Sequence, residues 1–470
     1  MIDQALYDLS ISQAAELLSA GKLSPVELVS AHLDRIERTE PQLNSFITLL
    51  AEDAVEQART AERDIRSGNY ISPLHGIPIG LKDLYYTRGI RTTVGSRILR
   101  DFVPDYDAAV TERFRESGAI LIGKLQMHEF ALGATSVNPF YGPAHNPWDV
   151  SRITGGSSGG SGSAVAAGQC MAALGSDTGG SVRIPAGLCG IVGLKPSFGL
   201  VSRYGVYPLS WSLDTVGPMT RTARDAALVM NTIAGYDARD PSSAQRPVED
   251  FTSSLDRGID GVRVGIPDDF FYDVIDPEVS EAICTAAGVL SDLGASVDRV
   301  SIPALDHSLA ISNAILSAEA AEVHATHLRE QPEDIGEDVR ARLRRGALTL
   351  ATDYIKAQRA RSAFNAELDD TMKGCDLLIA PTIPTGAPRI DQTVVDVAGN
   401  PENALTLMSR LTRPFNICGY PTVTVPCGFT KSGMPIGMQI AGRMFEDAAV
   451  LGAAHAYEQA TEWHRRRPTV

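Results

Sequence analysis

The sequence lacks the residue patterns of metal and redox sites. Its six cysteines include no C-x-x-C pair, and its nine histidines show no H-E-x-x-H or comparable spacing. Scattered cysteines in apolar surroundings usually behave as small buried hydrophobic residues. We therefore expect free buried thiols and no bound metal ion.

Clustered positive charge and long apolar runs are also absent. The chain has 42 Lys and Arg against 57 Asp and Glu, which gives a net charge of −15 over 470 residues. A nucleic-acid-binding surface needs clustered Lys and Arg, and a membrane-spanning helix needs about eighteen apolar residues in a row. The first residues have neither the basic start nor the apolar core of a signal peptide. We expect a cytoplasmic protein that binds neither nucleic acid nor a membrane.

Glycine and serine, by contrast, gather in two clusters, GGSSGGS at 155–161 and DTGGS at 177–181. Glycine has no Cβ, so it adopts positive φ angles and lets a ligand approach backbone N–H groups closely. The segment 164–175 between the clusters consists of small, mainly apolar residues, typical of a buried helix and strand. The two serine loops are therefore expected to hold a fixed relation to each other, unlike flexible linkers.

Three interpretations of the first cluster compete. A phosphate loop needs a Lys followed by Ser or Thr, and no lysine occurs between Arg152 and Arg183. A nucleophile elbow matches formally as G-x-S-x-G, but that motif follows an apolar strand, whereas residues 145–152 are polar and interrupted by proline. A low-complexity loop is the usual outcome for a single cluster of this kind.

A resemblance to a known family favours a catalytic interpretation. GGSSGGS from Gly155, GSDTGGSVRIPA from Gly175 and HGIPIGLKD from His75 resemble the signature segments of the amidase signature family. The similarity continues through four later segments, at 193–197, 213–218, 416–428 and 434–442. It thus covers most of the chain.

The resemblance implies a Ser-Ser-Lys triad of Lys82, Ser157 and Ser181. Ser181 would be the nucleophile, and Ser157 would carry its proton to Lys82 and later to the leaving amine. Lys82 accepts a proton only when neutral, so either burial in apolar surroundings or nearby hydrogen-bond donors must lower its pKa from about 10.4. The family further implies a cis peptide bond between Gly156 and Ser157, and an oxyanion hole made by four backbone N–H groups, those of Thr178, Gly179, Gly180 and Ser181.

Other residues near the clusters receive less specific assignments. Ser158 either orients Lys82 or Ser157 or is a structural hydroxyl in a tight loop. Asp177 and Arg183 are expected to pair with each other or with the backbone, a structural role. Five residues are candidates for lining the substrate pocket, with ordinary core packing the favoured interpretation of each: Met127, Tyr204, Tyr207, Trp211 and Phe415.

The segment pattern predicts an α/β protein, an α/β/α sandwich around a large mixed β-sheet, in one domain over 1–470. A capping box at Ser24 to Glu27 marks a helix in a helical N-terminal cover, whose edges offer a surface for a homodimer. The expected parts are the cover at 1–70, a signature-bearing half at 71–235, and a second half of the same sheet at 256–470 with a helical insertion at about 305–372. The basic run Arg340 to Arg345 within the insertion is interpreted as a solvated helix face, in preference to an anion site.

These observations favour a stand-alone serine amidohydrolase that uses no metal or organic cofactor. Its expected substrates are uncharged amides, aryl amides or carbamates, with esters as a side activity. The alternative is the A subunit of a glutamyl-tRNA(Gln) amidotransferase, which segments 202–205 and 354–361 resemble. Ser409 stands where that subunit has an acidic residue, and Ser312 and Asn313 stand in place of its paired tyrosines. The groups expected to hold the amino-acid end of glutamine, and any fixed charge for it, are therefore missing.

Overall fold

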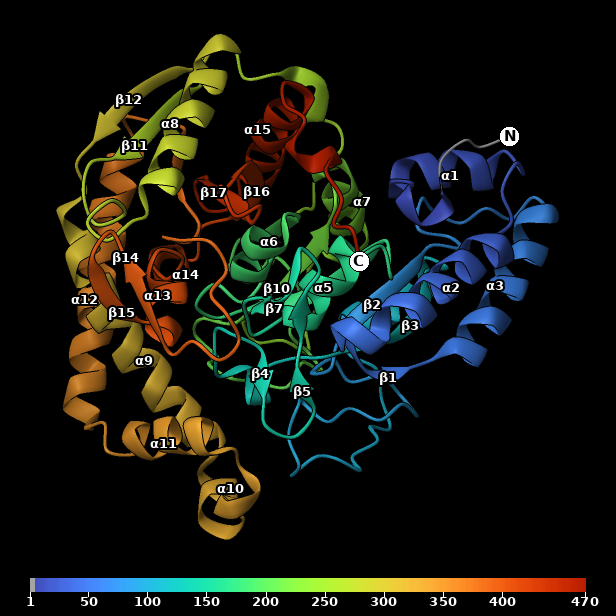
Figure 1. The fold of residues 1–470 in the computed structure, drawn as a ribbon, viewed down its shortest axis with the longest axis horizontal. Helices are drawn as coiled ribbons and strands as arrows, with labels where there is room; N and C mark the ends of the chain where they lie inside the picture. The colour runs from blue at the N-terminus through green and yellow to red at the C-terminus, as the bar shows by residue number, and fades with distance from the viewer. Residues whose placement is uncertain (1–4) are drawn as a thin grey trace.

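One eleven-stranded mixed sheet organises the chain, with helices on both of its faces (Figure 1). The structure is a computed structural model and describes residues 5–470. In sheet order, the strands are β1 (Phe46–Leu49), β3 (Ile120–Leu125), β2 (Pro78–Lys82), β8 (Ala172–Asp177), β10 (Thr215–Thr220), β9 (Val192–Lys195), β16 (Thr422–Phe429), β17 (Pro435–Ala441), β13 (Leu377–Pro381), β11 (Arg263–Pro267) and β12 (Ser296–Val300). The predicted α/β/α sandwich around a mixed sheet is confirmed.

The N-terminal segment is less purely helical than expected. Its helices are α1 (Ile11–Ser19), α2 (Pro25–Leu43) and α3 (Ala51–Arg66). The capping box at the start of α2 is present, because the Ser24 hydroxyl accepts from the Glu27 N–H and the Glu27 carboxylate accepts from the Ser24 N–H. Between α2 and α3, however, β1 pairs antiparallel with β3. This segment therefore also supplies an edge strand of the main sheet.

Strands β2 and β8 lie side by side and run parallel, with Leu81 opposite Leu174. Every residue of both strands is buried, as the apolar runs in the sequence require. Parallel neighbours end at the same edge of a sheet, and ligand sites in α/β folds form at that edge. Lys82, the last residue of β2, is thereby placed beside the carboxyl end of β8.

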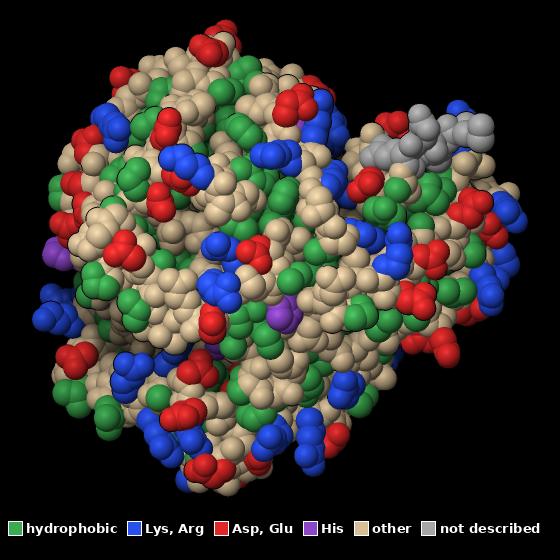
Figure 2. Space-filling view, viewed as in Figure 1, with side chains coloured by type: hydrophobic (Ala, Val, Ile, Leu, Met, Phe, Trp, Pro, Cys, Tyr) green, Lys and Arg blue, Asp and Glu red, His purple; other side chains and the backbone are tan. Residues whose placement is uncertain are grey.

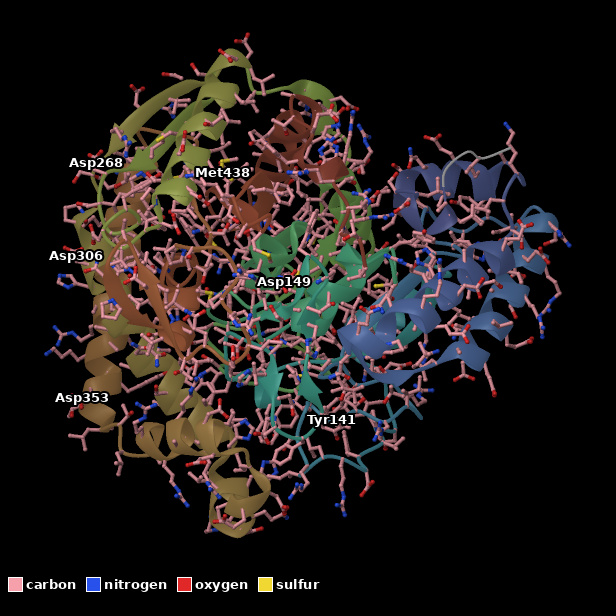
Figure 3. The ribbon with its side chains drawn as sticks, in the orientation of Figure 1. Tyr141, Asp149, Asp268, Asp306, Asp353 and Met438 are labelled. Atoms are coloured by element: carbon pink, nitrogen blue, oxygen red, sulfur yellow. The ribbon has the colours of Figure 1, made fainter. Side chains whose placement is uncertain are left out.

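The remaining strands and helices complete the two layers around the sheet. Strands β16 and β17 form an antiparallel hairpin, and Met438 on β17 lies in the interior (Figure 3). The helices that follow α3 up to residue 292 are α4 (Ala109–Glu116), α5 (Gly159–Ala166), α6 (Arg183–Cys189), α7 (Ala223–Ile233) and α8 (Pro277–Asp292). The chain ends with α15 (Asp447–Gln459).

The insertion forms a helical lobe at the lower left of Figure 1. Its helices, together with the two short helices near it, are α9 (Ser308–Val323), α10 (Ala325–Glu330), α11 (Glu337–Gly346), α12 (Ala351–Thr371), α13 (Ala404–Arg410) and α14 (Pro414–Cys418). Asp306 and Asp353 lie at the outer edge of this lobe in Figure 3. The lobe thus brings helices from the second half of the chain to one side of the sheet.

The surface and the cysteines agree with the composition. Acidic and basic side chains are interspersed over the face shown in Figure 2. All six cysteines are free, and all except Cys284 are buried. Within residues 5–470, none of the helices has the length and apolar character needed to cross a bilayer.

Candidate active site

Lys82 lies at the centre of the site, completely buried. Its Nζ lies 2.7 Å from Ser157 Oγ and 2.9 Å from Ser176 Oγ. Burial lowers the pKa of the Lys82 ammonium to about 7, although the negative charges of Asp214 and Asp177 partly oppose the shift. A substantial fraction of Lys82 is therefore neutral at neutral pH, the state in which it accepts a proton.

Ser157 sits in a tight loop that leads directly into α5. The peptide bond between Gly156 and Ser157 is cis. The Ser157 carbonyl accepts hydrogen bonds from the His128 N–H at 3.0 Å and from Ser136 Oγ at 3.2 Å. A Cβ on Gly156 would lie 2.7 Å from the Ser136 nitrogen, so only glycine fits before Ser157. These contacts hold the Ser157 hydroxyl against Lys82.

Ser176 is a site residue that sequence reasoning missed. It lies near the carboxyl end of β8 and is the second hydroxyl in contact with Lys82 Nζ. Ser158 supports it, since Ser158 Oγ accepts from the Ser176 N–H at 3.3 Å. Of the two roles considered for Ser158, the structure thus shows a contact with the backbone of β8 and none with Lys82. The sequence alone offered no signal for Ser176, because only the pairing of β8 with β2 brings its hydroxyl to Lys82.

Ser181 is buried less deeply than the other two residues of the expected triad. It is 8% exposed, whereas Lys82 and Ser157 are fully buried. The backbone N–H groups of Thr178, Gly179 and Ser181 have no hydrogen-bond partner within residues 5–470. The N–H of Gly180 instead donates to Asp177 Oδ1 at 2.8 Å. Of the four N–H groups expected to form an oxyanion hole, that of Gly180 is therefore already occupied.

Asp177 and Arg183 form the buried pair that braces this loop. Arg183 Nε and Nη2 donate to the two carboxylate oxygens of Asp177, both at 3.0 Å, and Asn416 Nδ2 adds a further bond at 2.7 Å. Burial alone would raise the pKa of the Asp177 carboxyl, but Arg183 and Asn416 outweigh it and lower the pKa to about 2. The remaining Arg183 donors reach the Thr412 carbonyl and the Gln439 side chain. Asp177 and Arg183 therefore pair with each other, and Arg183 also pairs with the backbone, the two kinds of contact expected from the sequence.

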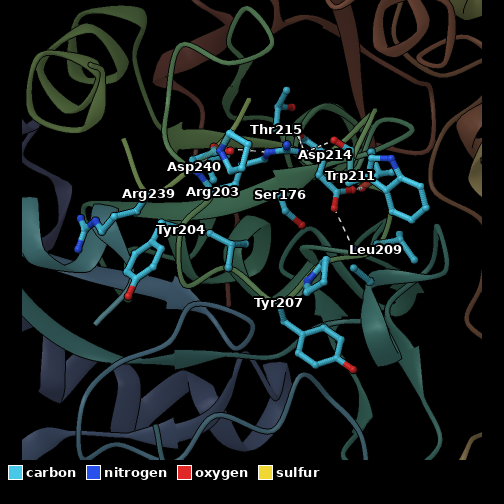
Figure 4. A pocket seen from close by; sticks show the side chains of 16 residues that line it. Ser176, Arg203, Tyr204, Tyr207, Leu209, Trp211, Asp214, Thr215, Arg239 and Asp240 are labelled. Atoms are coloured by element: carbon cyan, nitrogen blue, oxygen red, sulfur yellow. Dashed lines mark hydrogen bonds and ion pairs between the residues drawn. The ribbon is translucent and has the colours of Figure 1, made fainter. Parts of the chain in front are cut away.

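A cavity of about 180 Å³ opens beside the end of β8. Figure 4 shows Ser176 within it, surrounded by Tyr204, Tyr207 and Trp211. Met127 and Phe415, also proposed for the pocket, do not line this cavity. Both are buried in the hydrophobic cores. Their apolar character reflects core packing, the alternative favoured from the sequence.

A charged side chain lies beside two of the three residues from which an uncharged site was predicted. Ser409 Oγ accepts a hydrogen bond at 3.1 Å from Nε of Arg413, and Asn313 Oδ1 accepts from its Nη1. Ser312 is buried, and its hydroxyl has no partner within residues 5–470. Two of the three residues that favoured an uncharged site therefore hold an arginine, which sequence reasoning did not consider.

Comparison with known proteins identifies the family. The amidase family model matches residues 27–451. The A subunit of the glutamyl-tRNA(Gln) amidotransferase of Chloroflexus aggregans (strain MD-66 / DSM 9485) is 44% identical, with 98% of each chain covered. Among solved structures, one from a vestigial protein complex that reveals the evolutionary origins of an s-triazine catabolic enzyme is 34% identical, with TM-score 0.93, covering 96% of this chain and 98% of that one. A bacterial aryl acylamidase is 28% identical, with TM-score 0.91, covering 98% and 99%.

These relatives overturn one expectation and confirm another. The expectation of an enzyme that works alone on small molecules, without a nucleic-acid partner, conflicts with curated relatives that are subunits of an amidotransferase for glutamyl-tRNA(Gln). The low positive charge is a property of this chain alone, so it did not exclude a nucleic-acid partner. The family suggested by the two glycine-serine clusters is borne out over nearly the whole length. The chain belongs to the amidase signature family.

Proposed function

We propose that this chain is the amide-hydrolysing subunit of an assembly like the glutamyl-tRNA(Gln) amidotransferase. The observation that carries the proposal is the contact of 2.7 Å between Lys82 Nζ and Ser157 Oγ in a fully buried site. The identity of 44% with an A subunit over 98% of both chains supports the assembly. In that assembly the chain would release ammonia from an amide.

The chemistry begins with attack by Ser181 Oγ on the amide carbonyl carbon. Ser157 takes the proton of Ser181 as its own hydroxyl proton passes to neutral Lys82. The free N–H groups of Thr178, Gly179 and Ser181 would donate to the resulting oxyanion, and each such donor is typically worth about 3 kcal/mol in the transition state. The developing charge therefore meets donors that the loop already holds in place.

Collapse of the tetrahedral intermediate breaks the C–N bond. The leaving amine takes a proton from Ser157, which recovers one from Lys82, and an acyl ester remains on Ser181. Water then attacks that ester by the same proton route, releasing the acid and restoring Ser181. The same triad would cleave activated esters and carbamates, because their carbonyl carbons are attacked in the same geometry.

The test is ammonia release from glutamine and other primary amides. The full chain is assayed alone and in the assembly that it forms with its partner subunits. We expect release that increases in the assembly and disappears in Ser181→Ala. Equal activity of wild type and Ser181→Ala would overturn the catalytic assignment, and full activity of the chain alone would overturn the dependence on partners.

A further inference from the structure

Arg413 is a guanidinium without an anionic partner. Its Nε and Nη1 donate to the neutral side chains of Ser409 and Asn313, and no ion pair to Arg413 exists within residues 5–470. The positive charge of a second arginine, Arg342 on α11, also acts on Arg413. Partial burial and the charge of Arg342 lower the pKa of Arg413 to about 10, so the side chain remains charged at neutral pH. Arg413 is partly exposed, so an anion can reach its guanidinium, and that anion would offset the repulsion between the two arginines.

Arg413 also lies against the loop of residues 178–181, which carries the proposed oxyanion donors and is called the oxyanion loop below. A Cβ on Gly179 would be 3.7 Å from Cγ and 3.8 Å from Nε of Arg413. The preceding residue, Thr412, donates from Oγ1 to the Gly179 carbonyl at 2.6 Å, and its own carbonyl accepts from Arg183 at 2.9 Å. The Arg413 side chain therefore lies against Gly179, which precedes Ser181 by two residues.

A cavity of about 840 Å³, lined by residues of α9, α11 and α13 among others, includes Arg413 in its lining. Its charged lining consists of Asp338, Arg342, Arg345, Asp353 and Arg413. Asp338 already binds His128 Nε2 at 3.1 Å, and Asp353 is exposed at the outer edge of the lobe (Figure 3). Neither carboxylate pairs with Arg413. The run Arg340 to Arg345, interpreted from the sequence as a solvated face, thus turns Arg342 and Arg345 toward this cavity.

We propose that Arg413, with Arg342 beside it, binds a carboxylate carried by the amide substrate. The planar guanidinium matches the two oxygens of a carboxylate, and Ser409 and Asn313 fix its orientation. The substrate class is therefore a small amide that bears a carboxylate, such as the monoamide of a dicarboxylic acid or an amino-acid amide like glutamine. This inference rests on the proposed amide hydrolysis at Ser181 and names the group that the site selects.

The test compares acid monoamides with matched uncharged diamides. Succinamate and glutaramate differ from succinamide and glutaramide only by a carboxylate in place of a carboxamide. For the full chain in its assembly, we expect kcat/KM for the monoamide acids to exceed that for the diamides at least tenfold. In Arg413→Gln that preference should vanish, mainly through an increase in KM, while Arg413→Lys should retain part of it. Arg344→Gln is the matched control, because Arg344 is exposed on α11 and does not line the cavity.

A structural role for Arg413 predicts a different result. If Arg413 only braced Ser409 and Asn313, Arg413→Gln would lower kcat for monoamide acids and diamides equally. That outcome, or equal kcat/KM for both classes in the wild type, overturns the proposal. Thermal unfolding of Arg413→Gln and Arg413→Lys shows whether each variant is folded. If Arg413→Gln does not fold, kcat/KM for monoamide acids and diamides is compared in Arg413→Lys.

A binding measurement separates this inference from the proposed function. Succinamate is titrated by calorimetry into full-length Ser181→Ala, with and without Arg413→Gln, and inorganic phosphate is titrated in parallel. Weakening of succinamate binding at least tenfold by Arg413→Gln supports the subsite even if no amide is hydrolysed. No weakening, or phosphate binding tighter than succinamate at Arg413, contradicts it. Absence of hydrolysis with intact succinamate binding would overturn only the proposed function.

Discussion

Lys82 Nζ and Ser157 Oγ lie 2.7 Å apart, and both side chains are inaccessible to solvent. A lysine in such a place pays a large desolvation penalty for its charge, which favours the neutral amine. The fold creates this situation by ending β2 beside the parallel strand β8 and by packing α5 directly against the junction. Burial of Lys82 therefore lowers the stability of the folded chain. The same burial leaves the amine neutral and able to accept a proton.

The first prediction concerns the pH dependence of turnover. Neutral Lys82 is the active form, and burial places its pKa at about 7. Below that pH the protonated form dominates, so kcat/KM should fall about tenfold for each pH unit and should level off above pH 8. Steady-state rates between pH 5 and 9 measure this. A rate that stays constant across pH 5.5 to 7.5 would be incompatible with Lys82 as the base.

The second prediction concerns the charge on residue 82. Lys82→Arg keeps a permanent positive charge, and Lys82→Met removes the amine, so neither accepts a proton from Ser157. Both should lose activity by about a thousandfold or more, since a coupled relay fails as a unit. Lys82→Met should fold normally, because a buried charge is replaced by an apolar chain of similar length. Near-wild-type turnover in Lys82→Arg is the result that the relay does not permit.

The third prediction concerns Ser176. Its hydroxyl accepts a hydrogen bond from Lys82 Nζ at 2.9 Å, and it therefore stabilises the charged lysine. Ser176→Ala should lower the pKa of Lys82 further and move the acid limb of the rate profile to lower pH. The loss of one hydrogen bond to a charged group should also reduce kcat by about 10-fold. Ser158→Ala is the control, because Ser158 contacts the backbone of β8 and not Lys82, so its acid limb should stay in place.

The fourth prediction concerns the buried pair of Asp177 and Arg183. Arg183→Met leaves the Asp177 carboxylate buried without its partner, which should lower the free energy of unfolding by about 3 to 5 kcal/mol. The exposed Arg66, which pairs with Glu62, is the control, and Arg66→Met should cost less than about 1 kcal/mol. Denaturant unfolding at pH 7 measures both. Equal effects of the two substitutions would show that the pair does not support the fold.

Acid should weaken the same pair in wild type. The Asp177 carboxyl has a pKa of about 2 in the folded chain and an ordinary value of 3.8, so its depressed pKa stabilises the folded state above pH 4. That contribution, about 2 kcal/mol, should be lost as the pH falls from 4 toward 2. In Arg183→Met, the decrease in the free energy of unfolding between pH 4 and pH 2 should be smaller than in wild type.

The proposed catalytic serines could be found from the sequence because glycines surround them. Other atoms lie so close to the backbone of Gly156 and Gly180 that only glycine fits there. The loops around Ser157 and Ser181 therefore have an unusual composition. The buried helix and strand predicted between the two clusters were equally accessible, because α5 and β8 consist of small, mainly apolar residues. These features depend on local chain geometry, which a short stretch of sequence largely determines.

Features that depend on tertiary packing were not predictable in the same way. Ser176 meets Lys82 only because two strands run parallel in register, and the Gly180 N–H is occupied only because Asp177 turns back toward it. Arg413 lies against the oxyanion loop because Thr412 is tied to Gly179. Met127 and Phe415 have the composition of pocket residues, but their side chains point into the cores. In each case the direction of a side chain decided the outcome.

The most direct test of the proposed chemistry is the identity of the acylated serine. The full chain is treated with a fluorophosphonate, digested, and analysed by peptide mass spectrometry, with Ser181→Ala and Lys82→Met treated in parallel. We predict one label on Ser181 in wild type, none in Ser181→Ala, and a labelling rate at least a hundredfold lower in Lys82→Met. A label on Ser157 or Ser158 in wild type would contradict the assignment of Ser181 as the nucleophile.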